Sequence, residues 1–245
     1  MPGSIYSLFI LICLLILSAH SPGYRGIFDL IADLDGMHGS TNQLMFISVG
    51  IPMTVLTITQ LMKFKDRGPF ATRLETRFQI FHIYAITAVV LSFVFTVLIL
   101  MVSWVAGGLM VGFDNTWLNA KGMISQTTHD QNRFFSILPQ LTTYKVLGTL
   151  FVTKFLGFLM IAFLTLFLKN WFKNDGIVLI VLVALAGVDQ LSLVPIPIFT
   201  LSANLWLGNW LNPMTTFFHC AYLLIVSIFL YGITGILFER RDFLS

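Results

Sequence analysis

Two ionisable side chains lie deep inside apolar stretches of this sequence, where a charge is costly. Lys154 lies within Tyr144–Leu168 and Asp189 within Gly176–Leu193. Counted from the inner boundaries of these stretches at 1.5 Å per helical residue, their depths are ~22 Å and ~20 Å. Because intramembrane charges usually face the bundle interior or a cavity, the matched depths predict a Lys154–Asp189 ion pair between adjacent helices. A substrate or proton site, and a lysine that snorkels to the outer surface, are the alternatives.

The other reactive side chains form no pattern typical of catalysis or metal binding. His82 and His219 have no acidic or histidine partner at metal-ligand spacing, and Cys13 and Cys220 both fall inside apolar stretches. The fragment Asp33–Gly36 resembles the start of a calcium loop but lacks its downstream ligands. Phosphate-loop, zinc-protease, nucleophile-elbow and dinucleotide motifs are also absent. We expect no enzymatic activity, cofactor or metal on this chain.

The elements that carry these residues are membrane spans. Hydrophobic residues make up 57% of the sequence and charged residues 10%, with a mean hydropathy of +0.87, whereas soluble domains are about 25% charged. Most of the apolar stretches are near the ~20 residues that cross a bilayer. The sequence predicts an all-α polytopic membrane protein, a single transmembrane domain over 1–245. Its six predicted spans are Ser4–Ala19, Leu44–Leu61, Ile80–Val105, Tyr144–Leu168, Gly176–Leu193 and Thr216–Phe238.

The basic residues predict the orientation of these spans. The net charge of +3 does not indicate a nucleic-acid partner, because lysines and arginines flank the spans instead of forming one face. Placing both termini in the cytoplasm puts most of the basic loop residues inside, as the positive-inside rule requires. The basic residues assigned to the cytoplasm are Lys63, Lys65, Arg67, Arg73, Arg77, Lys169, Lys173, Arg240 and Arg241.

The cytoplasmic loop between the second and third spans carries a predicted short amphipathic helix. Gly68-Pro69 is a suitable helix start, since proline is tolerated at the first helical position. Apolar residues then recur at helical spacing, with arginines on the opposite face. The helix either lies on the membrane surface or docks onto a partner protein. Its apolar residues are Phe70, Leu74, Phe78 and Phe81, and its arginines are Arg73 and Arg77.

The outer segment Val194–Pro213 contains no charged side chain, which is unusual for a solvent-exposed loop. Irregular backbone at membrane depth is tolerated only inside protein or beside a water-filled cavity. We therefore expect a re-entrant element that lines an exit vestibule; a loop packed over the helix ends is the alternative. The residues assigned to this exit segment are Pro195, Pro197, Trp206 and Trp210.

Three motifs together resemble the permease subunits of small, six-span bacterial ABC exporters, a class that serves drug, peptide, lipid and polysaccharide export. They are the basic run Gln60–Arg67 leading into Arg73–Arg77, the proline-containing segment Val194–Pro213, and the terminal Tyr231–Phe243 with its Phe-Glu-Arg-Arg-Asp ending. Length and topology match over the whole chain. These permeases usually begin with an amphipathic cytoplasmic helix, whereas three residues precede the first predicted span here.

The resemblance implies a function and a set of partners. The chain would be the permease of an ATP-driven exporter in the bacterial plasma membrane, moving an amphipathic or hydrophobic cargo such as an antimicrobial peptide or drug. It would pair with a second, identical or homologous permease and with two copies of an ABC ATPase subunit, which binds the ATP and Mg²⁺. An ion-coupled secondary transporter or channel is the alternative. The residues that would contact the ATPase are Arg67, Phe70, Arg73, Leu74 and Arg77.

Overall fold

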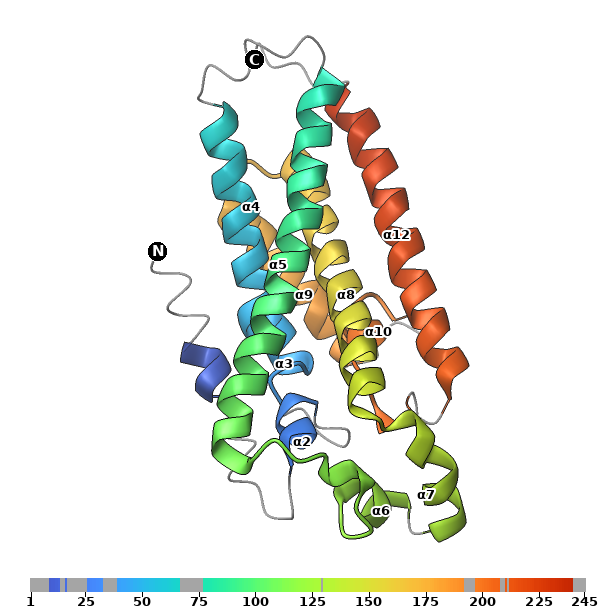
Figure 1. Cartoon of the computed structure of the whole chain (residues 1–245). Helices are drawn as coiled ribbons and strands as arrows, with labels where there is room; N and C mark the ends of the chain where they lie inside the picture. The colour runs from blue at the N-terminus through green and yellow to red at the C-terminus, as the bar shows by residue number, and fades with distance from the viewer. Residues whose placement is uncertain are drawn as a thin grey trace.

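The structure is a computed structural model that describes residues 9–13, 16, 26–32, 39–66, 77–128, 130–191, 197–207, 210 and 212–239. Within these residues the elements are helices and no strand occurs. Long helices run along one bundle axis, and the short helices α2, α6 and α7 gather at one end of it (Figure 1). The predicted all-α fold is confirmed.

Four helices of the described residues are long and apolar enough to cross a membrane. The first combines α3 (Gln43–Met45), the π-helical turn η1 (Phe46–Gly50) and α4 (Ile51–Asp66). The other three are α5 (Arg77–Val111), α8 (Thr143–Trp171) and α12 (Pro213–Glu239). They coincide with the second, third, fourth and sixth predicted spans, which supports the assignment as a membrane protein.

The other two predicted spans are not confirmed. The fifth corresponds to α9 (Asp175–Gln190), an apolar helix of 16 residues, shorter than the ~20 residues of a typical span. Most of the first, Ser4–Ala19, lies outside the described residues, although 9–13 and 16 are helical. The number of spans in the whole chain therefore remains a prediction.

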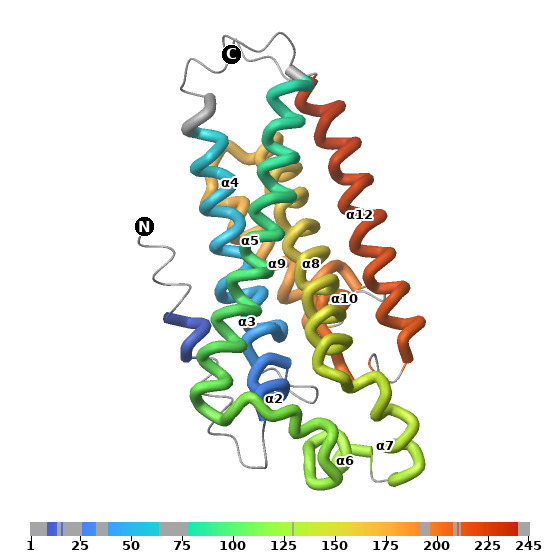
Figure 2. The backbone as a smooth tube through the Cα atoms, in the orientation of Figure 1, coloured from blue at the N-terminus to red at the C-terminus, as the bar shows by residue number. Residues whose placement is uncertain are grey.

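The central helix of the bundle is α8, which packs against α4, α5, α9 and α12 and runs between them in the tube view (Figure 2). In its most apolar window 72% of the residues are buried, against 33% for both α5 and α12. Large apolar side chains on α5 and α12 remain exposed, such as Phe93 and Phe229. A chain that leaves such surfaces uncovered needs lipid or another protein around them.

The end of the bundle that carries α2, α6 and α7 is closed by a cap of short helices. It comprises α2 (Ile27–Ile31), the 3₁₀ turns η2 (Thr116–Leu118) and η3 (Leu138–Gln140), α6 (Met123–Thr128) and α7 (Gln131–Ile137). Asp29, fully buried, accepts hydrogen bonds from the Trp117 indole nitrogen at 2.6 Å and from the Gly26 amide at 2.9 Å. None of these short helices was predicted from the sequence.

Candidate functional site

The carboxylate of Asp189 accepts hydrogen bonds from the short helix α10 (Thr200–Ala203) and the residues just before it. Asp189 is in the last turn of α9 and is 2% exposed. A carboxylate at this position satisfies amides that a helix start leaves without partners, and its charge is favourable at the positive end of the helix dipole. Its donors are Ile198 N (2.8 Å), Phe199 N (2.9 Å), Thr200 N (2.6 Å), Thr200 Oγ1 (2.6 Å) and Leu201 N (3.2 Å).

The ammonium group of Lys154 binds the other end of the same helical turn. Its Nζ atom donates a hydrogen bond to the carbonyl oxygen of Ala203 at 2.6 Å. The same nitrogen lies 5.0 Å from the centre of the Phe46 ring, which is cation–π distance. Lys154 is 1% exposed and comes from the middle of α8. A cation is favourable there because helix C-termini carry partial negative charge.

The expected direct ion pair between Lys154 and Asp189 is not found. Both residues are described, and the contacts of both lead to α10 instead of to each other. The two charges thus bind opposite ends of one helical turn, about 6 Å long at 1.5 Å per residue. Snorkelling of Lys154 to the outer surface is also excluded by its burial. The matched depths of Lys154 and Asp189 correctly predicted that the two residues belong to one site. They did not predict that α10 lies between them.

A glycine on α8 makes room for this arrangement. A Cβ atom on Gly157 would lie 2.9 Å from the Ala203 Cβ and 3.0 Å from a ring carbon of Phe46. The absence of a side chain therefore lets α10 and η1 approach α8 closely enough for Lys154 to reach both. The π-helical turn η1, which carries Phe46, is of a kind often found at functional sites.

Two further helices contact the same segment. Gln43, at the start of α3, donates to Thr200 Oγ1 at 3.4 Å, and the Tyr222 hydroxyl of α12 donates to the Ile198 carbonyl at 3.2 Å. Residues from α3, α8, α9 and α12 therefore meet around α10. A buried polar network joined to this many helices fixes their relative positions when it is fully paired.

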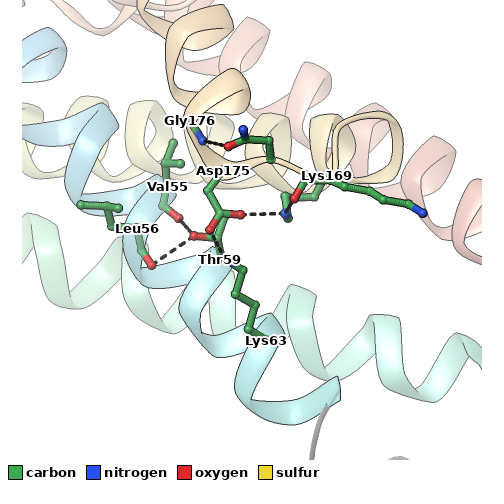
Figure 3. Close-up of polar contacts among 9 residues, drawn as sticks. Val55, Leu56, Thr59, Lys63, Lys169, Asp175 and Gly176 are labelled. Atoms are coloured by element: carbon green, nitrogen blue, oxygen red, sulfur yellow. Dashed lines mark hydrogen bonds and ion pairs between the residues drawn. The ribbon is translucent and has the colours of Figure 1, made fainter.

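A second charged cluster lies at the opposite end of α8 and α9 (Figure 3). Lys169 Nζ donates to Asp175 Oδ1 at 2.7 Å and also to the Lys173 carbonyl at 2.9 Å. Lys63, near the end of α4, donates to the other carboxylate oxygen of Asp175. The exposed side-chain fractions are 10% for Lys169, 21% for Asp175 and 55% for Lys63. Asp175 therefore joins three elements: α4, α8 and α9.

The lysines control the ionisation of Asp175. Burial by itself raises the pKa of this carboxyl, but the hydrogen bonds and positive charges of Lys169 and Lys63 outweigh it. The pKa of Asp175 consequently lies below its usual range. Asn174, the N-cap of α9, completes this turn by accepting the Gly176 amide at 2.9 Å.

The residues predicted to contact an ATPase are mostly outside the described part of the chain. This applies to Arg67, Phe70, Arg73 and Leu74. Arg77 is the first residue of α5, and Phe78 and Phe81 continue that helix. These three residues therefore belong to α5, of which Phe78–Val111 is long and apolar enough to cross a membrane.

The predicted exit segment is only partly described, and its described residues differ in exposure. Pro195 lies outside the described residues, and Pro197 is half-buried. Trp206 is 47% exposed, whereas Trp210 is 5% exposed and packs edge-to-face on Trp117 with ring centres 5.8 Å apart. Within the described residues, the contacts of this segment with Asp189 and Lys154 are made by its backbone and by the Thr200 hydroxyl.

The Lys63–Asp175–Lys169 cluster was not predicted, although the sequence contains a signal for it. Lys63 and Lys169 were interpreted only as charges that set the orientation of the spans, but Asp175 is an acid that lies beside them at the same predicted boundary.

No group of three or more histidine, cysteine or acidic residues that could hold a metal occurs in the described residues. Comparisons with protein families, curated proteins and solved structures found no match to this chain.

Proposed function

We propose that this chain is the permease subunit of an ATP-driven exporter, with six spans and both termini in the cytoplasm of a bacterial cell. Its partners are a second permease, identical or homologous, and two copies of an ATPase subunit that binds ATP and Mg²⁺. The segment Arg67–Arg77 contacts the ATPase, and the cargo is amphipathic or hydrophobic, an antimicrobial peptide or a drug. Chemistry on this chain is not required, because its task is to change conformation.

The observation that carries the proposal is the position of the Lys63–Asp175 contact. It ties the end of α4, three residues before its last residue Asp66, to the turn between α8 and α9. The basic segment 67–76 follows α4 directly in the sequence. A partner that moves this segment would therefore act on α4 and, through Asp175, on the most buried helix of the bundle. Coupling of two sites requires such an element with two arrangements.

The length of α9 supports a re-entrant outer segment. Its 16 residues span about 24 Å, less than the ~30 Å of a hydrocarbon core. Asp189 and α10 therefore lie at membrane depth if α9 starts at the inner boundary. The backbone of α10 is paired there by Asp189 and Lys154, as irregular backbone at that depth requires.

The test is co-purification with an ATPase subunit. A tagged copy of this chain, expressed with the ATPase encoded nearest to its gene, should retain that subunit through gel filtration. The complex should hydrolyse ATP, and reversing the charges of Arg73 and Arg77 together should release the ATPase while the permease still inserts. Retention of the ATPase by the charge-reversed variant would exclude this segment as the contact, and a failure of the unaltered chain to bind any ATPase would exclude the proposal.

One observation favours an ion-coupled secondary transporter or channel instead. Lys154 is buried in the bundle, and the contacts described for it are a carbonyl oxygen and an aromatic ring, with no carboxylate among them. Ionisable residues buried at membrane depth commonly mark substrate or ion pathways. Proteoliposomes that contain only this chain distinguish the two functions. Cargo movement driven by a pH gradient without ATPase, and lost in Lys154→Met, would establish the ion-coupled function.

A further inference from the structure

One face of α8 carries a lysine at each end. The residues of this face follow one another at helical spacings of three or four, and all are buried. The residues between the lysines are small or apolar, apart from one threonine whose hydroxyl donates to the carbonyl four residues earlier at 2.8 Å. The face consists of Lys154, Gly157, Ile161, Thr165 and Lys169.

One face of α9 carries an aspartate at each end in the same way. Its residues again follow at spacings of three or four, and its interior positions are buried and apolar. The two aspartates are 14 residues apart in the sequence, or about 21 Å along the helix. The face consists of Asp175, Val178, Leu182, Ala186 and Asp189.

Lysines of α8 thus fasten α9 at both of its ends, one from the middle of α8 and one from its last turn. At one end Lys169 binds Asp175 directly, and at the other Lys154 and Asp189 bind the two ends of α10. If the outer ends of α8 and α9 separate, α10 can keep only one of these two contacts. The position of α10 therefore depends on the spacing of the two helices.

The end with the direct contact is also the end that α4 touches. Lys63 shares Asp175 with Lys169, but Lys63 is far more exposed than Lys169, 55% against 10%. An exposed ion pair changes the equilibrium between two conformations only a few fold. The Lys63–Asp175 contact is therefore the one that can be released most easily. Lys169, which also binds the Lys173 carbonyl, stays with α9 when Lys63 leaves.

We propose that α8 and α9 form one lever that links the end of α4 to α10, about 21 Å away. Displacement of α4 breaks the contact between Lys63 and Asp175 and lets the α8–α9 pair tilt. The tilt weakens the contacts of α10 with Lys154 and Asp189. The source of that displacement, a partner acting on segment 67–76, rests on the proposed function. The linkage itself belongs to this chain alone and is measurable without any partner.

The reporter for this linkage is a single cysteine in α10. Ser202 is 1% exposed, and its hydroxyl has no hydrogen-bond partner in the described structure, so Ser202→Cys removes no contact. With Cys13 and Cys220 replaced by alanine, a water-soluble maleimide should label purified Ser202→Cys slowly, at a rate set by the opening of its surroundings. Adding Asp189→Asn should raise this rate at least tenfold, which verifies that the reporter senses the seat of α10.

The decisive variant is Lys63→Met in the same background. The lever predicts labelling of Ser202→Cys about two- to fivefold faster, the change that the loss of an exposed ion pair allows. Lys63→Arg should restore the slow rate because it keeps the pair. Lys173→Met is the matched control: it removes an equal charge from the turn between α8 and α9, beside the same cluster. The structure gives the Lys173 side chain no contact within the described residues, so the rate should not change.

Two outcomes overturn the proposal. If Ser202→Cys is labelled at the same rate in Lys63→Met and in Lys173→Met, α4 is not linked to α10. If Asp189→Asn does not change the labelling rate, α10 is not held in place by Asp189. The dependence of the labelling rate on salt concentration is a second measurement, and it does not require that a Lys63 variant folds. Raising ionic strength screens the exposed pair and should speed labelling of the otherwise unaltered chain, but not of Lys63→Met. Because no ATPase is present, a failure here is separate from a failure of co-purification.

Discussion

Lys154 and Asp189 bind opposite ends of the same helical turn, so α10 lies between the two buried charges of α8 and α9. The anion is at the N-terminal end of α10 and the cation at its C-terminal end. This is the polarity that the helix dipole favours. The two charges compensate each other through the turn and do not touch.

This relationship predicts that α10 couples the two residues energetically. Asp189→Leu leaves several buried donors without an acceptor and should lower the stability of the detergent-solubilised protein by about 3 kcal/mol. Lys154→Met should also destabilise, and the double variant should depart from additivity by about 0.5 kcal/mol or more, because both residues act on the same turn. Unfolding of the single and double variants completes the cycle.

An exposed N-cap provides the control for this cycle. Asp130 accepts one amide, from Asn132 at 2.9 Å, at the start of α7. Asp130→Leu should cost only about 1 kcal/mol, the usual value for a cap. Additive effects of Asp189→Leu and Lys154→Met would mean that α10 does not link the two charges.

The close approach at Gly157 gives a second prediction. In Gly157→Ala the new methyl group would lie 2.9 Å from the Ala203 Cβ, closer than carbon atoms pack, so α10 must shift. Overpacking of this kind costs about 1–3 kcal/mol. Gly148→Ala on the same helix meets nothing within 4 Å and should be neutral or stabilising by up to about 1 kcal/mol. Thermal unfolding of the two variants compares them, and equal midpoints would show that α10 is not seated against α8.

Apolar length was sufficient to predict the four long helices from sequence, but not the clusters between them. Lys154 and Asp189 were placed at one depth by counting residues along two helices. The helix between them is four residues long, too short to show any periodicity. Lys63 and Asp175 are 112 residues apart in the sequence, and nothing local indicates that α4 ends beside the α8–α9 turn. The two charged clusters depend on how the helices pack against one another, whereas the long helices can be recognised from local composition.

The lysines around Asp175 predict a dependence on pH. Because the pKa of Asp175 is lowered in the folded protein from 3.8, its contribution to stability is present above about that pH and is lost as pH falls through the lowered value. The difference in unfolding midpoint between the unaltered chain and Asp175→Asn should therefore narrow as the pH falls from 6 to 3. A constant difference over this range would show that the carboxylate contributes nothing as a charge.

The same cluster predicts unequal effects of its two lysines. Lys169→Met removes a largely buried, charge-assisted hydrogen bond and should cost about 1.5–3 kcal/mol. Lys63→Met removes an exposed pair and should cost at most about 1 kcal/mol. The comparison at neutral pH uses the same unfolding measurement, and an equal or larger loss for Lys63→Met would reverse the assignment of Lys63 as the releasable contact.

The final prediction concerns which side of the membrane each end of α9 faces. Lys173 and Trp206 are both exposed and flank α9 on either side, so cysteines at these positions differ chiefly by the passage of that helix. With the native cysteines replaced, Trp206→Cys should react with a membrane-impermeant thiol reagent in intact cells. Lys173→Cys should react only after the cells are permeabilised, because the lysines around it mark the cytoplasmic side. A cysteine placed at the exposed Leu118 in the cap of short helices should behave like Trp206→Cys. If Trp206→Cys and Lys173→Cys both react only after permeabilisation, both ends of α9 face the cytoplasm and the chain has fewer than six spans. If Lys173→Cys reacts in intact cells, the orientation of the whole bundle is the reverse of the one proposed.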